Sequence, residues 1–257
     1  MKYLNDVSYK DCVGKVCKSK SSGDFKVLKY NGARDVEIQF LKTGFETTVR
    51  LGDIRNGNLK DPYSPSVYSI GIVGTKYPIS EGGVLTKEYK QWCGMLQRCY
   101  SDSYQKQRPT YEGCEVGDNF KYYEYFYEWC HSQIGFGMDG WQLDKDLLIK
   151  GNKVYSENTS VFIPREINQV LVKRTALRGE HLIGVYWHKR GKAFAAQVNK
   201  SNGGSEYLGL FKTEIEAFNA YKIAKEIYIK ELANKWRDKI DERVYNALMN
   251  YEVNVND

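Results

Sequence analysis

The first 78 residues alternate apolar and polar positions in the manner of half-buried β-strands. Asn31-Gly32 and Thr43-Gly44 supply the turns, since glycine accepts the positive φ that hairpins require. The residues that face one side on the two best-marked strands are Val36, Ile38 and Phe40, then Phe45, Thr47, Val49 and Leu51. The pattern predicts a small, strongly bent β-barrel over residues 1–78.

Residues 79–172 change to helical spacing, and their apolar positions are rich in aromatic side chains. We interpret both helical stripes as core, because buried aromatic stripes are far commoner than base-stacking surfaces. The stripes are Trp92, Met95, Leu96 and Cys99, and then Phe120, Tyr123, Phe126, Tyr127 and Cys130.

The same region ends in a predicted ββα unit. A strand is expected over residues 143–149, followed by a turn at Gly151-Asn152 and a short return strand in "SVFI". A helix is expected to start at Pro164, because the missing N–H of proline has no partner in a first helical turn.

Residues 173–257 predict a three-stranded antiparallel sheet packed on a helix. The strands are separated by turns at "KRGK" and "SNGGS", and Thr213 with Glu216 forms a capping box at the start of the helix. The fold class is therefore α+β, with predicted domains at 1–78, 79–172 and 173–257. The residues expected on the buried face of the last helix are Ala217, Ala220, Tyr221, Ala224 and Ile227.

Charge and cysteine content narrow the classes of function. The chain has 257 residues and a net charge of +6, a moderate excess that suits a nucleic-acid partner. Six cysteines occur without a C-x-x-C pair, so we expect reduced thiols and no zinc. Neither a signal peptide nor a long apolar segment is evident, which predicts a cytoplasmic protein without membrane contact.

The last region resembles the APETALA-type, ethylene-response-factor-like DNA-binding domain. The matching letters are "GVYWHKRGK", "AAQV", "YLGLF" and "EAFNAYKIA", which cover residues 183 to about 228. In that family the sheet enters the major groove of double-stranded DNA, and its exposed face reads bases and phosphates. The resemblance implies that this chain binds DNA through the same sheet.

This chain departs from the family at most of the positions that contact DNA. Arginines and tryptophans that are common in the family are replaced here. The DNA sequence that the family recognises therefore cannot be taken as the target of this chain. Between residues 181 and 213, five lysines and arginines accompany the single acid Glu206, and Trp187 and Tyr207 add flat stacking area. The predicted DNA-binding residues are Tyr186, His188, Lys189, Arg190, Lys192, Gln197, Asn199 and Tyr207.

The stretch "WQLDKDLLIKGNKVYSENTSVFIPREIN" resembles the HNH nucleases, in which a hairpin and a helix surround one divalent cation. The resemblance implies a metal ligand at Asp144, the central asparagine at Asn158 and a helix ligand at Asn168. Asp146 adds a second carboxylate that could join a Mg²⁺ or Mn²⁺ site. These four residues therefore outline a metal site and the group that orients its base.

Lys145 stands where that family has its general-base histidine. An ordinary lysine is protonated at neutral pH and could only pair with phosphate, although burial beside a metal would favour its neutral form. His131, at the end of an aromatic helix, is the other conceivable base, but such a histidine is more often structural.

These features predict a phage-type DNA-binding protein derived from an HNH endonuclease, with weak or lost cleavage. One alternative is an active metal-dependent homing endonuclease. Another is a host-takeover or anti-defence protein that uses the scaffold to bind a host protein, with which 21 tyrosines are compatible.

Overall fold

The computed structural model describes residues 12–172, 180–201 and 203–257, and it is mixed α+β as predicted. Contacts divide the chain into two compact units. The first holds the described residues up to Glu112 together with Asp118–Tyr127, and the second holds Gly113–Gly117 and Glu128–Asp257. Each unit is described by itself below.

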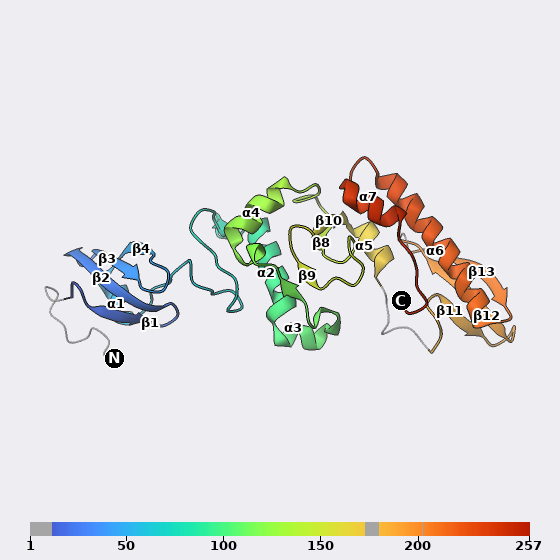
Figure 1. Cartoon of the computed structure of the whole chain (residues 1–257), viewed down its shortest axis with the longest axis horizontal. Coiled ribbons are helices and arrows are strands. Elements are labelled where there is room, and N and C mark those ends of the chain that lie inside the picture. The colour runs from blue at the N-terminus through green and yellow to red at the C-terminus, as the bar shows by residue number, and fades with distance from the viewer. Residues whose placement is uncertain (1–11, 173–179, 202) are drawn as a thin grey trace. The chain divides into compact units, whose positions relative to one another are not determined.

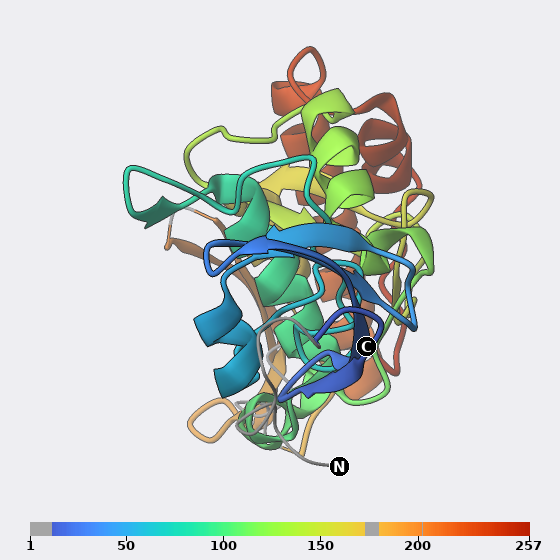
Figure 2. The same cartoon turned by 90° about the vertical axis from the view of Figure 1, so that its left-hand side faces the viewer.

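The first unit begins with a four-stranded antiparallel sheet in the order β1-β2-β3-β4. Its elements are β1 (Val16–Ser19), β2 (Gly23–Gly32), β3 (Asp35–Phe40), β4 (Glu46–Val49) and helix α1 (Leu51–Asn56), drawn in blue in Figures 1 and 2. Val36, Ile38 and Phe40 are fully buried, which confirms the predicted strand face.

The predicted barrel is wrong, because this sheet stays open. No ladder joins β1 to β4 among the described residues, so both are edge strands. The reason lies in the chain after β4: that strand is only four residues long, and α1 begins at Leu51 before the chain could return to β1. Leu51 and Ile54 of α1 pack into the core of the sheet instead.

Helices dominate the rest of the first unit. They are α2 (Lys87–Tyr100), α3 (Asp102–Gln107) and the 3₁₀ helices η3 (Pro109–Tyr111) and η4 (Asn119–Lys121), with a short hairpin of β5 (Ser80–Glu81) and β6 (Val84–Leu85) before them. Helix α4 (Tyr123–Ser132) begins in this unit and ends in the second. The predicted aromatic stripes are confirmed as core, except that Tyr127 is only half-buried.

The second unit contains the predicted hairpin and helix. Its elements are β7 (Glu115–Val116), β8 (Trp141–Asp144), β9 (Val154–Tyr155), β10 (Val161–Pro164) and α5 (Arg165–Leu171), with β8 antiparallel to β10 and β7 parallel to β9. The strand predicted over 143–149 is wrong in extent. It ends at Asp144, because the Asp144 carboxylate accepts hydrogen bonds from the backbone N–H groups of Asp146 and Leu147 and bends the chain there.

The three-stranded sheet and its helix follow the prediction closely. Strands β11 (Val185–His188), β12 (Ala193–Asn199) and β13 (Ser205–Phe211) pair antiparallel in that order, ahead of α6 (Glu214–Trp236) and α7 (Glu242–Met249). The capping box of Thr213 and Glu216 is present. Ile227 is the exception on the predicted helix face, since its side chain is 53% exposed while Ile229 is fully buried.

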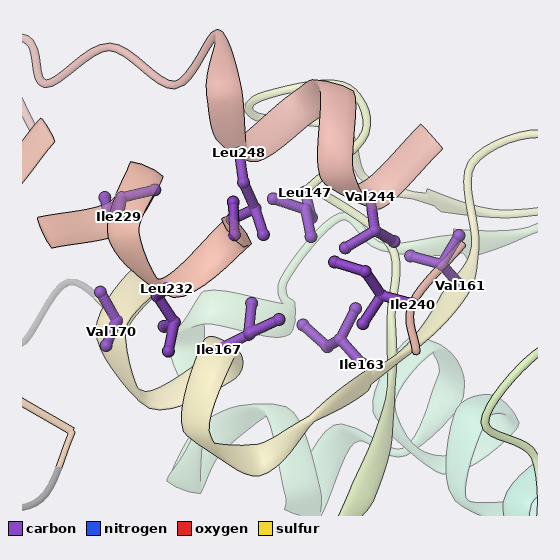
Figure 3. Packing of buried hydrophobic residues seen from close by; sticks show 11 residues of the cluster. Leu147, Val161, Ile163, Ile167, Val170, Ile229, Leu232, Ile240, Val244 and Leu248 are labelled. Carbon is purple, nitrogen blue, oxygen red and sulfur yellow. The ribbon is translucent and has the colours of Figure 1, made fainter. Parts of the chain in front are cut away.

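One hydrophobic core joins the hairpin to the C-terminal helices. Figure 3 shows Leu147, Val161 and Ile163 of the hairpin region pointing toward side chains of α5, α6 and α7. The change of buried face along α6 follows from this core, because its first half packs on the sheet and its second half packs on α5 and α7. The hairpin and the C-terminal sheet therefore belong to one compact unit.

No helix in the described part of the chain is long and apolar enough to cross a membrane.

Candidate functional site

The register of β11–β13 gathers the polar and aromatic residues of the predicted DNA surface on one face. Side chains of directly opposed residues share a face, and here Tyr186 opposes Ala195 and Gln197 opposes Tyr207. The other face carries Val185, Ala196 and Val198, which pack against α6. The face turned away from α6, called the open face, carries Tyr186, His188, Ala193, Ala195, Gln197, Asn199, Ser205, Tyr207 and Leu210.

The open face combines exposed rings with amide groups and no charge of its own. Tyr186 is 40% exposed, Tyr207 56% and Leu210 45%. The Gln197 amide nitrogen donates to the side-chain oxygen of Asn199 at 3.3 Å, which leaves the amide nitrogen of Asn199 free to donate outward. None of the residues that the register places on this face is acidic.

Cations gather at one end of this face, in the turn between β11 and β12. Lys189, Arg190 and Lys192 are exposed there, and none of them makes an ion pair with another described residue. The turn is tight: Lys192 has a φ of +46°, and the N–H of Gly191 donates to Nδ1 of His188 at 3.0 Å. That bond makes Nδ1 the acceptor, so a neutral His188 presents its Nε2–H as a donor.

Two residues of the basic, aromatic stretch between residues 181 and 213, Trp187 and Lys200, lie on the helix side instead. Trp187 opposes Phe194, and their rings meet edge to face at 5.0 Å, so the expected stacking area of Trp187 beside Tyr207 is not formed. Lys200 pairs with Glu206 at 3.0 Å and lies over the ring of Tyr228 on α6. The one acid of the region is thereby neutralised away from the open face.

The second candidate site is the loop that follows β8. Oδ1 of Asp144 accepts from the N–H of Leu147 at 2.8 Å and from the N–H of Asp146 at 3.0 Å. Burial, and then the like charge of Asp146, raise the pKa of Asp144 to about 6, although those two backbone hydrogen bonds oppose the shift. Asp144 is thus a partly buried carboxylate with one oxygen committed to the loop.

Lys145 points into the loop and away from any solvent-facing position. Its side chain is buried, and its Nζ donates to the carbonyl of Asn152 at 3.1 Å and lies 3.4 Å from Oδ2 of Asp146. The ammonium also lies over the ring of Tyr155, at 5.8 Å from its centroid. Through these contacts Lys145 stabilises the conformation of the loop.

The two predicted asparagines are not brought together with Lys145. Asn158 is exposed in a turn and makes no hydrogen bond with any residue in the described ranges. Asn168 donates to Gln142 at 2.5 Å, and Gln142 shares a strand face with Asp144 two residues later. Asn168 and Asp144 therefore border the same side of the hairpin, whereas Asn158 does not orient a base.

His131 lies on the opposite side of the hairpin from Asp144. Its ring contacts Phe136 at 5.2 Å, and Phe136 in turn contacts Phe162 at 5.4 Å. Phe162 and Asp144 face opposite sides, because Asp144 is paired with the neighbouring residue Val161. His131 is therefore not placed to act as a base beside Asp144.

The residues fit a metal ion only sparsely. Asp144 and Asp146 supply carboxylate oxygens and Asn168 an amide oxygen, the ligand type that Mg²⁺ and Mn²⁺ prefer. Among the described residues, however, no group of three or more His, Cys, Asp or Glu side chains could hold a metal.

Two residues of the second unit, Asn152 and Lys225, have surroundings that the sequence did not predict. Asn152 organises the hairpin loop, since its amide donates to the carbonyls of Lys145 and Val154 at 2.6 and 2.7 Å. The Gly151-Asn152 turn signal marked its position but not this role. Lys225 is partly buried, and no pattern in the sequence marks this, because a lysine within a helical pattern predicts a solvated face.

Comparison of the chain with protein-family models, with curated proteins and with solved structures finds no match.

Proposed function

We propose that this protein binds double-stranded DNA through the open face of β11–β13 and the turn that joins β11 to β12. The observation that carries the proposal is the difference in residue type between the two faces of this sheet. One face packs against α6 through Val185, Ala196 and Val198, whereas the open face carries the amides and tyrosines and is bordered by the cations of the β11–β12 turn.

The chemistry of the open face suits a groove of DNA. Side-chain amides such as those of Gln197 and Asn199 can bond adenine edges, and Nε2–H of His188 can donate to a guanine or to a phosphate. Lys189, Arg190 and Lys192 at one end would meet phosphates, because each is exposed and unpaired within the described chain. The absence of acids on this face removes a repulsive contribution to binding.

We further propose that cleavage by the hairpin is weak or lost. The contacts of Lys145 support this, because its side chain is buried and its Nζ donates to the carbonyl of Asn152, so the group at the base position serves the loop. The alternative of an active Mg²⁺- or Mn²⁺-dependent HNH nuclease keeps Asp144, Asp146 and Asn168 as ligands. That alternative requires another base.

A host protein is the other candidate partner, and the exposure of Tyr186, Tyr207 and Leu210 favours it. The two partners differ in how binding responds to salt. Displaced counterions make DNA affinity fall steeply with salt, whereas a largely uncharged aromatic contact tolerates it.

The test is DNA affinity as a function of salt concentration for the full chain and two double variants. Arg190→Ala with Lys192→Ala should weaken binding and reduce the slope of log affinity against log salt by about 2, one counterion for each lost phosphate contact. Lys26→Ala with Lys42→Ala removes the same charge from exposed positions on β2 and in the turn between β3 and β4, and it is the control. Equal losses in both variants would contradict the proposed surface.

A further inference from the structure

A cavity of about 640 Å³ opens in the second unit where strand β11 begins. It lies among the end of α5, the segment before β11, the last residues of β12, and α6. Its volume is within the range of sites that hold small organic ligands. Tyr186, Gln197 and Asn199 of the open face are among its lining residues, so the cavity adjoins the proposed DNA surface.

The backbone is shaped to leave this space. Gly184 has a φ of +76°, and a Cβ there would come within 2.0 Å of the ring of Tyr221. Only glycine therefore lets the segment before β11 lie against the Tyr221 ring, which forms part of the wall.

The cavity contains a cation without a counter-charge. Lys225 lines it, is partly buried, and makes no hydrogen bond or ion pair with any residue in the described ranges. None of the lining residues that the structure describes is acidic. Burial lowers the pKa of Lys225 to about 8, which shows how poorly water solvates this ammonium.

The other lining groups are of two kinds. Gln169 and Asn199 bring amide donors, and Val170, Leu182 and Ile183 form an apolar wall. Lys200 also lines the cavity, but its ammonium is already paired with Glu206. A ligand that fits must therefore carry both an anionic group with several acceptor oxygens and an apolar, flat or compact body.

We propose that this cavity is a nucleotide-binding site, in which Lys225 and the neighbouring amides take the phosphate and the apolar wall takes the base or sugar. The nucleotide could be free, or it could be a unit of DNA bound on the open face. A nucleotide supplied by bound DNA depends on the proposed function. A free nucleotide does not depend on it.

The test uses dAMP, deoxyadenosine and a DNA duplex as probes for the full-length protein and its Lys225→Met variant. Methionine keeps the length of the side chain and removes the charge. Lys230→Met, at an exposed position of the same helix, is the matched control. Because Lys225→Met removes a poorly solvated charge, we expect the variant to be folded, which its thermal unfolding will report.

For a free nucleotide, calorimetry should show dAMP bound at least about tenfold more weakly by Lys225→Met than by the wild type, since a charge-assisted hydrogen bond is lost. Lys230→Met should bind dAMP as the wild type does, and deoxyadenosine should bind weakly to all three proteins. If DNA supplies the nucleotide, the same loss appears in duplex affinity and not with dAMP.

Two results would overturn this site. One is equal affinity of the wild type and Lys225→Met for both dAMP and the duplex. The other is binding of deoxyadenosine by the wild type that is both readily measured and as tight as that of dAMP, because the phosphate would then contribute nothing. Lys225-dependent binding of dAMP by a protein that does not bind the duplex would refute the proposed function and leave the nucleotide site standing.

Discussion

Glu166 on α5 links the region of the hairpin to the C-terminal helix α6 by hydrogen bonds. Its carboxylate accepts from Nζ of Lys235 and from Nε1 of Trp236, each at 2.8 Å, and from the hydroxyl of Ser201 at 3.1 Å. Burial opposes ionisation of Glu166, but these hydrogen bonds outweigh it and keep its pKa below the usual range. One side chain of α5 is thus fixed to the end of α6 and to the turn after β12.

We therefore expect Glu166→Gln to lower the free energy of unfolding by about 1–3 kcal/mol at pH 7, as for loss of a hydrogen-bonded charge. A carboxyl whose folded-state pKa is depressed contributes stability above its unfolded pKa and loses it as pH falls through the folded pKa. The difference between variant and wild type should accordingly shrink below about pH 4.

Urea unfolding at pH 7 and near pH 3 measures both effects. Glu252→Gln, at an exposed position, removes one carboxylate of the same kind and should have little effect. Equal urea midpoints for Glu166→Gln and the wild type at pH 7 would mean that these hydrogen bonds add no net stability.

At the scale of elements, the sequence pattern correctly predicted the features that depend only on the geometry of a single strand or helix. The alternation in β3, the helical stripe of α2 and the Thr213–Glu216 capping box all reflect local geometry, and each is confirmed. The same alternation places Tyr207 and Trp187 on opposite faces once the register is known. Residue type alone had grouped them, because both are aromatic and lie in the same basic stretch of the sequence, although β12 separates their strands.

The predictions failed where tertiary contacts or side-chain hydrogen bonds to the backbone determine how far an element extends or which face it buries. The strand after Trp141 stops at Asp144 because a carboxylate captures two backbone N–H groups, a competition that apolar spacing does not reveal. Ile227 is exposed because α6 changes packing partners along its length. Closure of the N-terminal sheet depended on where α1 begins.

The two faces of the sheet provide a matched pair of aromatic substitutions. Tyr207→Leu on the open face should weaken DNA binding about three- to tenfold, the value of one lost polar contact of about 1 kcal/mol. Trp187→Leu on the helix side should leave DNA affinity nearly unchanged and lower thermal stability, since its ring packs on Phe194. Both quantities come from fluorescence anisotropy with labelled DNA and from thermal melts. A larger affinity loss in Trp187→Leu would invert the assignment of faces.

For the whole molecule, the hairpin and the C-terminal sheet share one compact unit. The core in Figure 3 links the hairpin to α5, α6 and α7, and α6 in turn supports the sheet. The hairpin and the open face are therefore held in a fixed relation to each other. Whether the hairpin can act on DNA bound to the open face depends on Lys145, whose Nζ is engaged by the carbonyl of Asn152.

The most direct measurement incubates the full chain with supercoiled plasmid in Mg²⁺, in Mn²⁺ and in EDTA, and scores nicking and gel shift on the same samples. We expect a salt-sensitive shift under all three conditions and little or no nicking. Lys145→His should add only weak metal-dependent nicking, which Asp144→Ala abolishes, because imidazole is a competent base but position 145 is buried and Asn158 does not orient the new ring. Rapid metal-dependent nicking by the wild type, or no shift at low salt, would contradict a protein that holds DNA without cutting it.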